Sequence, residues 1–207
     1  MTRILVVDDH PVVRSGLVSI LLRQPDFQVA GEAADGLTAV AEYQRLKPHV
    51  VVLDLSLPGL DGWQALARIR ELDPAARVLV ISTFGGDEDV HRALEAGAKG
   101  YLLKESTEDE IVGAVRAVTE GRTRVSGAAA ESMAERMKYS PLTKRELEVL
   151  EGMARGQSNK EIGWKMGVTE STIKGHVANI MSKLGVDDRT LAVTLAIQRG
   201  LIRLPKP

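Results

Sequence analysis

Five polar side chains of this sequence stand directly after short apolar runs, a placement that could assemble a phosphoryl-transfer site. They are Asp8, Asp9, Asp54, Ser82 and Lys104. Three carboxylates held close together repel one another, so they need a cation or must protonate. Because the ligands are oxygens, Mg²⁺ is the ion that they favour, with Mn²⁺ as the alternative. Beside such an ion Asp54 could act as a nucleophile and form an acyl phosphate, while Lys104 and Ser82 contact the phosphoryl oxygens.

The runs that precede these residues have the length and composition of buried strands. They are Ile4–Val7, Phe27–Ala30, Val50–Leu53, Val78–Ile81 and Tyr101–Leu103, and helical patterns lie near 11–23, 36–46, 62–72, 88–96 and 107–120. This alternation predicts an α/β fold with a doubly wound five-stranded parallel sheet. The C-terminal ends of parallel strands share one side of the sheet, where ligands bind, so we expect the five polar side chains to converge.

Each of these residues, taken alone, has a plainer explanation. An aspartate after a strand is often a helix cap or a turn former, and a lysine there is usually a solvated charge. Three histidines, His10, His49 and His91, do not converge in the pattern, so no histidine metal site is predicted. Five polar residues at corresponding strand ends nevertheless favour a common site over separate structural roles.

Four segments carry a resemblance to a known family. They are VVDD (6–9), LDLSLPGLDG (53–62), VISTF (80–84) and GAKGYLLK (97–104). On these motifs, residues 1–121 resemble a response-regulator receiver domain, which is flavodoxin-like. The resemblance implies that Asp54 accepts a phosphoryl group from a histidine kinase. It also implies that Asp9, Asp54 and the Ser56 carbonyl bind Mg²⁺, with Asp8 acting through water.

The same resemblance implies a switch pair, Ser82 and Tyr101. Thr83 adjoins Ser82 and competes for the switch role, but Ser82 stands 22 residues before Lys104, where the family's switch hydroxyl sits. The plainer interpretation of Tyr101 is a half-buried strand aromatic. Glu105 follows Lys104 where many receivers have proline, so a trans bond is expected and the geometry of Lys104 is left open.

Charge separates the rest of the chain from the receiver. Residues 1–121 carry −7, residues 122–141 carry +2 and residues 142–207 carry +4, so the net charge of −1 combines two opposite parts. A cationic module beside an anionic one suits a nucleic-acid partner.

Segment 122–141 has no strand pattern and is interpreted as a linker that is helical over Ala128–Met137. The sequence has no cysteine and no apolar run long enough to span a membrane, which suits a cytoplasmic protein.

Residues 142–207 predict four helices with short turns. Possible capping boxes begin at Thr143 and Ser158, Thr169 is a further N-cap, and glycines at 156, 167 and 185 stand where C-caps belong. The plain alternative is a generic helical interaction module. LTKRELEVLEGMARGQSNKEIGWKMGVTESTIKGHVANIMSKLGV (142–186) is similar to the LuxR-type helix-turn-helix. Joined to a receiver, this domain implies a NarL/FixJ-type response regulator.

The helix at 169–184 would then enter the major groove of DNA. The face opposite its apolar stripe is mostly small, and Gly175 is explained equally by close approach to DNA or by simple tolerance. We expect Lys174 to contact bases and Thr172, Asn179 and Lys183 to contact phosphates. His176 lies at the border of the apolar stripe and favours packing over DNA contact.

The last helix, near 187–199, must cover the helical core. The resemblance implies that it also forms a homodimer there, through residues such as Leu191 and Leu195, and that the dimer reads an operator with two half-sites.

The function predicted is a non-enzymatic, phosphorylation-controlled transcription factor. The sequence leaves open whether the unphosphorylated receiver masks the DNA-binding domain or simply fails to dimerise. A phosphotransferase of the haloacid-dehalogenase kind needs a second aspartate two residues after the nucleophile, but Ser56 stands there after Asp54. A third hypothesis is a regulator that binds DNA without phosphorylation. The complete acidic cluster argues against it.

Overall fold

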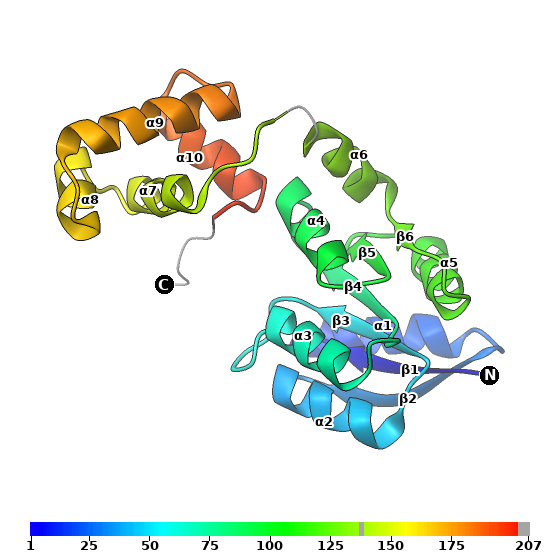
Figure 1. Cartoon of the computed structure of the whole chain (residues 1–207). Helices are drawn as coiled ribbons and strands as arrows, with labels where there is room; N and C mark the ends of the chain where they lie inside the picture. The colour runs from blue at the N-terminus through cyan, green and yellow to red at the C-terminus, as the bar shows by residue number, and fades with distance from the viewer. Residues whose placement is uncertain (137–138, 203–207) are drawn as a thin grey trace. The chain divides into compact units, whose positions relative to one another are not determined.

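The computed structural model describes residues 1–136 and 139–202 of the chain, which contacts divide into two compact units. One unit comprises Met1–Gly85 with Val90–Ala130, and the other comprises Gly86–Asp89 with the chain from Glu131 onward. Figure 1 shows the helices and strands that make up these units.

A parallel sheet of six strands in the order β2-β1-β3-β4-β5-β6 forms the centre of the first unit. The strands are β1 (Thr2–Val7), β2 (Phe27–Ala33), β3 (Val50–Asp54), β4 (Val78–Ser82), β5 (Gly100–Leu103) and β6 (Arg124–Val125). The helices between them are α1 (Pro11–Leu22), α2 (Gly36–Leu46), α3 (Gly62–Leu72), α4 (Asp87–Glu95) and α5 (Glu108–Thr119). The predicted doubly wound α/β fold is therefore confirmed.

Burial on both faces explains the continuous apolar runs within the first, third and fourth strands. Alternate residues such as Ile4, Val6 and Val52 join one core with Leu17 of α1 and Ile111 of α5. The residues between them along the strands are also buried, and α2 and α3 contact each other and the sheet on the other side (Figure 1). Such a sheet needs long connections between its strands and brings all the C-terminal strand ends to one side.

A sixth strand, β6, was not predicted, and it carries the sheet beyond residue 121. The backbone N–H of Arg124 donates to Lys99 O at 3.0 Å, and that of Ser126 donates to Tyr101 O at 3.0 Å. A Cβ atom on Gly100 would lie 2.5 Å from Arg124 O, so glycine permits this approach. Helix α6 (Gly127–Arg136) follows at once. It agrees with the predicted helical linker, except that Met137 lies outside the described residues.

The second unit holds the helices α7 (Lys144–Ala154), α8 (Asn159–Met166), α9 (Glu170–Leu184) and α10 (Arg189–Gln198). Both predicted capping boxes are present, and Thr169 caps α9 by accepting from the Thr172 N–H. Gly167 and Gly185 end α8 and α9 in the left-handed conformation. The four helices share one core, which includes Leu150, Ile162, Ile173, Ile180 and Ala196.

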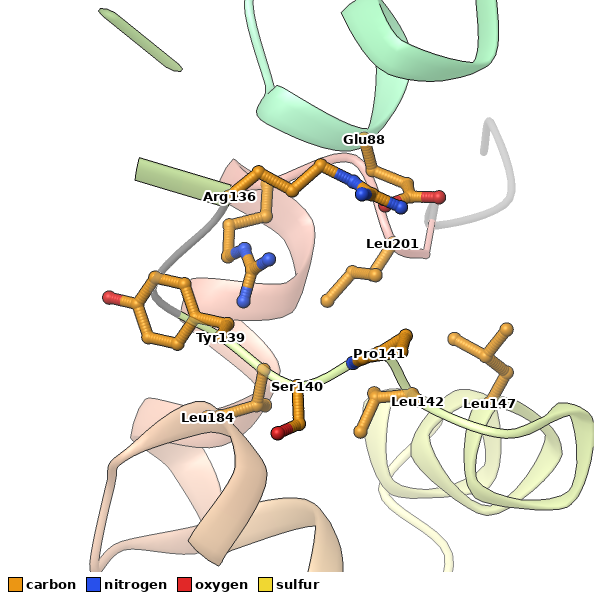
Figure 2. Close-up of a pocket in the computed structure, with 10 residues that line it drawn as sticks. Glu88, Arg136, Tyr139, Ser140, Pro141, Leu142, Leu147, Leu184 and Leu201 are labelled. Atoms are coloured by element: carbon orange, nitrogen blue, oxygen red, sulfur yellow. The ribbon is translucent and has the colours of Figure 1, made fainter. Parts of the chain in front are cut away.

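A small pocket lies where the chain enters this helical core. The segment Tyr139–Leu142 lines it together with Leu147 of α7 and Leu184 of α9 (Figure 2). The end of the linker therefore packs beside both helices.

Candidate functional site

The polar residues at the strand ends converge as the sheet topology predicts. Ligand atoms of Asp8, Asp9, His10 and Asp54 all lie within 4.8 Å of one another. Asp8 and Asp54 are fully buried, whereas about a quarter of the Asp9 side chain is exposed. His10 was not predicted to belong to this group, although its position directly after the two aspartates was the available signal.

Lys104 is the cation that balances this group in the structure. Its Nζ lies 2.7 Å from Asp54 Oδ2 and 2.7 Å from Asp8 Oδ2. Burial lowers the pKa of Lys104, but its contacts with Asp54 and Asp8 outweigh burial and hold the pKa above its usual value. The bond between Lys104 and Glu105 is trans, as expected. The ammonium group is thus charged at neutral pH and bridges two carboxylates.

The donor set fits a hard divalent cation. Asp8 Oδ2 and Asp9 Oδ1 are buried, and apart from close contacts with Lys104 and His10 no donor among residues 1–136 and 139–202 reaches them. These contacts are Lys104 Nζ at 2.7 Å from Asp8 Oδ2 and His10 Nδ1 at 2.6 Å from Asp9 Oδ1. Carboxylates with spare lone pairs are what Mg²⁺ requires.

The loop after β3 holds the Asp54 carboxylate through a backbone hydrogen bond. The Ser56 N–H donates to Asp54 Oδ1 at 3.1 Å. A Cβ atom on Gly62, the first residue of α3, would lie 2.2 Å from the Asp54 carbonyl oxygen. The glycine lets the helix begin directly beside the strand end, so Asp54 is fixed at both its backbone and its side chain.

The two neighbouring hydroxyl residues after β4 have different environments. Ser82 is fully buried and its Oγ accepts from the Phe84 N–H at 3.1 Å, whereas Thr83 is exposed. Tyr101 is also fully buried, and its hydroxyl donates to Phe84 O at 2.6 Å. The plainer alternative, a half-buried strand aromatic, does not match this full burial. Ser82 and Tyr101 meet at the backbone of the same residue, Phe84.

In the helical unit, α9 exposes most of the residues predicted to meet DNA. Thr172 and Asn179 are exposed, and no heavy atom lies within 4 Å of a Cβ built on Gly175. Lys174 is exposed and pairs with Glu170 one turn earlier, at 2.9 Å. His176 is half-buried, in keeping with its position at the border of the apolar stripe.

Lys183 has partners that helical projection did not predict. Its Nζ donates to Glu146 Oε2 of α7 at 2.7 Å and to Pro141 O at 3.1 Å. The interaction competes with the predicted phosphate contact, since one ammonium would have to serve both.

Helix α10 leaves part of its apolar surface uncovered. The side chain of Leu191 is 48% exposed and Leu195 is half-buried. Both predicted dimer residues are accessible within this unit.

Comparison with known proteins identifies both halves of the chain. Residues 4–116 match the family described as "Response regulator receiver domain", and residues 140–196 match "Bacterial regulatory proteins, luxR family". The chain is a NarL/FixJ-type response regulator. Over 98% of its length this response regulator is 42% identical to the transcriptional regulatory protein LiaR of Bacillus subtilis, all of which is covered. It is 41% identical over 97% of its length to the response regulator protein VraR of Staphylococcus aureus, which is 99% covered.

Solved structures agree with this assignment. The response regulator resembles ChrA, the response regulator of a haem-sensing two-component system, with 38% identity, a TM-score of 0.57, and coverage of 97% of this chain and 98% of that one. A structure of RcsB bound to a promoter shares the fold, with a TM-score of 0.76 at 24% identity. Among the described residues, no helix is both long enough and apolar enough to cross a membrane. The response regulator acts as a transcription factor in a two-component system.

Proposed function

We propose that this response regulator accepts a phosphoryl group on Asp54 from a sensor histidine kinase. The buried Asp54 carboxylate, held by Ser56 N–H and Lys104, is the observation that supports this role. Asp54 attacks the phosphorus of a phosphohistidine, the P–N bond breaks, and an acyl phosphate forms as the kinase histidine is released. The receiver assists its own phosphotransfer and dephosphorylation but is not an enzyme toward another substrate.

Asp9, Asp54 and the Ser56 carbonyl would hold Mg²⁺ or Mn²⁺, with Asp8 acting through water. The ion, when bound, would offset the negative charge of the carboxylates and of the incoming phosphoryl group. Lys104 then exchanges its bond to Asp54 Oδ2 for one to a phosphoryl oxygen, because the phosphorylated carboxylate has lost its own charge.

Ser82 and Tyr101 transmit the effect of phosphorylation from Asp54 to the backbone around Phe84. Ser82 Oγ gives up the Phe84 N–H and donates to the phosphoryl group, which alters the backbone that Tyr101 also contacts. Tyr101 lies on β5, and its carbonyl accepts from the Ser126 N–H at the start of the linker. Thr83, which competes for this role, is exposed beside Ser82. The response therefore has a backbone route from the receiver into segment 122–141, which joins receiver 1–121 to the DNA-binding domain 142–207.

The output is sequence-specific DNA binding by a dimer in the cytoplasm. Lys174 contacts bases from one flank of the small surface at Gly175, while Thr172 and Asn179 on the other flank contact phosphates. Leu191 and Leu195 of α10 form the dimer contact, so that two copies read two half-sites. If so, Lys174→Ala should flatten the preference among operators, whereas Asn179→Ala should weaken binding to all sequences alike.

Beryllofluoride, a stable phosphoryl mimic, tests the phosphoswitch directly. With Mg²⁺ it should shift the wild-type chain toward dimer in size analysis and tighten promoter binding. Asp54→Ala should show neither change. The same response in Asp54→Ala, or no Mg²⁺-dependent response in the wild type, would refute the proposal.

A further inference from the structure

The ion pair between α7 and α9 is more enclosed than a surface contact. The Glu146 side chain is 5% exposed and that of Lys183 is 28% exposed. Their 2.7 Å contact joins residues 37 positions apart in the sequence. Lys183 lies in the last turn of α9, while Glu146 lies in the first turn of α7.

Glu146 is held from a second direction by the helix that it begins. Its Oε2 accepts from the Thr143 N–H at 2.7 Å, and Thr143 Oγ1 accepts from the Glu146 N–H at 3.3 Å. Burial raises the pKa of Glu146, but the hydrogen bonds from Lys183 and Thr143 outweigh it and lower the pKa. The carboxylate is therefore charged and fixed in place. Its charge is balanced by a cation only while Lys183 stays beside it.

Lys183 also reaches the last residue before the helical domain. Its Nζ donates to Pro141 O at 3.1 Å, in the segment that packs against Leu147 and Leu184 (Figure 2). One ammonium thus joins the end of the linker, the start of α7 and the end of α9. To reach a DNA phosphate it would have to leave the buried Glu146 carboxylate without a cationic partner, which is unfavourable.

We propose that Glu146 and Lys183 form a positioning pair, which fixes the recognition helix α9 for DNA binding without contacting DNA. This rests on the proposed function only in that α9 is taken to read DNA. It replaces the predicted phosphate contact of Lys183. The pair holds α9 in one orientation relative to α7. Loss of either partner therefore weakens DNA binding because α9 is no longer held in that orientation.

The salt dependence of DNA binding distinguishes the two roles. Each phosphate contact contributes about one to the slope of log affinity against log salt. The probe is a duplex selected from random sequences by the beryllofluoride-activated full-length chain. The variants are Glu146→Gln, Lys183→Gln and the double variant, with thermal melting of each to show that it folds. Glutamine at 146 can still accept from the Thr143 N–H, so only the charge is lost.

An exposed pair on α7 supplies the matched controls. Arg145 and Glu148 are 63% and 52% exposed and lie 2.8 Å apart. Glu148→Gln and Arg145→Gln make the same changes in net charge as Glu146→Gln and Lys183→Gln, but on an exposed face.

If the pair positions α9, Glu146→Gln weakens binding about tenfold, the effect of losing one charged hydrogen bond, even though it removes a negative charge. Its salt slope stays that of the wild type, and Glu148→Gln does not weaken binding. Lys183→Gln behaves like Glu146→Gln, the double variant is no worse than either, and Lys183→Arg restores affinity.

The opposite results would overturn the proposal. If Lys183 contacts phosphate, Glu146→Gln releases it and tightens binding, and Lys183→Gln lowers the slope by about one. A wild-type chain that selects no duplex would instead refute the DNA-binding function itself.

Discussion

Replacing Lys104 with methionine should destabilise the receiver in a way that Mg²⁺ partly reverses. Lys104 Nζ lies 2.7 Å from one oxygen of each buried carboxylate, Asp8 and Asp54. At an effective dielectric constant near 20, each contact is worth about 6 kcal/mol before desolvation. Desolvation of three charges offsets most of this sum, and removing one partner of a buried pair costs about 3–5 kcal/mol. We expect a loss near 3 kcal/mol, because the two remaining carboxylates can partly relax.

The magnesium dependence is the more specific part of this prediction. Without the competing ammonium, the carboxylates should bind Mg²⁺ about tenfold more tightly, so saturating Mg²⁺ restores roughly 1.4 kcal/mol more stability to the variant than to the wild type. The same reasoning predicts that adding Asp54→Asn to Lys104→Met recovers stability without metal, since one buried charge is gone.

Denaturant unfolding followed by Trp63 fluorescence measures these differences. The chain has two tryptophans, and a Trp164→Phe background leaves Trp63 of α3 to report on the receiver. Unfolding is compared in EDTA and in Mg²⁺, with the exposed Arg68→Met as a control for loss of one positive charge. Equal destabilisation by Lys104→Met in both buffers, or a double variant less stable than Lys104→Met, would refute the reasoning.

Three further outcomes are expected from single contacts. Tyr101→Phe removes the hydroxyl that donates to Phe84 O and should lower the free energy of unfolding by about 1 kcal/mol, measured by denaturant titration; an unchanged midpoint would contradict this. The stability that Glu146 contributes is complete above its ordinary pKa of 4.5 and is lost as pH falls through its lower folded-state pKa. Glu146→Gln should therefore flatten the acid limb of melting temperature against pH, and an unaltered limb would count against the pair. Gly62→Ala places a Cβ against the Asp54 carbonyl, so it should lower both stability and beryllofluoride binding, and wild-type behaviour would show that the loop yields freely.

The strands β1, β3 and β4 could be predicted because a strand buried on both faces needs a continuous apolar run. Val50–Asp54 and Val78–Ser82 follow the predicted runs to within one residue. The strand β6 could not be predicted in this way, since two residues, Arg124 and Val125, make no pattern. Their conformation depends on the backbone groups of β5 and on the space beside Gly100.

In the functional sites, features set by spacing along the sequence could be predicted, whereas contacts between separate helices could not. The spacing to Lys104 selected Ser82 over Thr83, and the structure buries the first and exposes the second. Helical projection placed Lys183 on a DNA-facing flank because it considers one helix at a time. The partner that occupies its ammonium, Glu146, lies on another helix and emerges only when the domain is folded.

The short strand β6 also determines where the receiver can be cut. A fragment that ends at residue 121 loses the N–H donors of Arg124 and Ser126 and leaves the carbonyls of Lys99 and Tyr101 open. The fifth strand would then be an unprotected edge, a template on which another chain can add a strand. Such a fragment would associate with itself whether or not Asp54 is phosphorylated, and its dimers would be an artefact of truncation. A fragment that continues through Ala130 keeps β6 paired with the fifth strand and removes this cause of association.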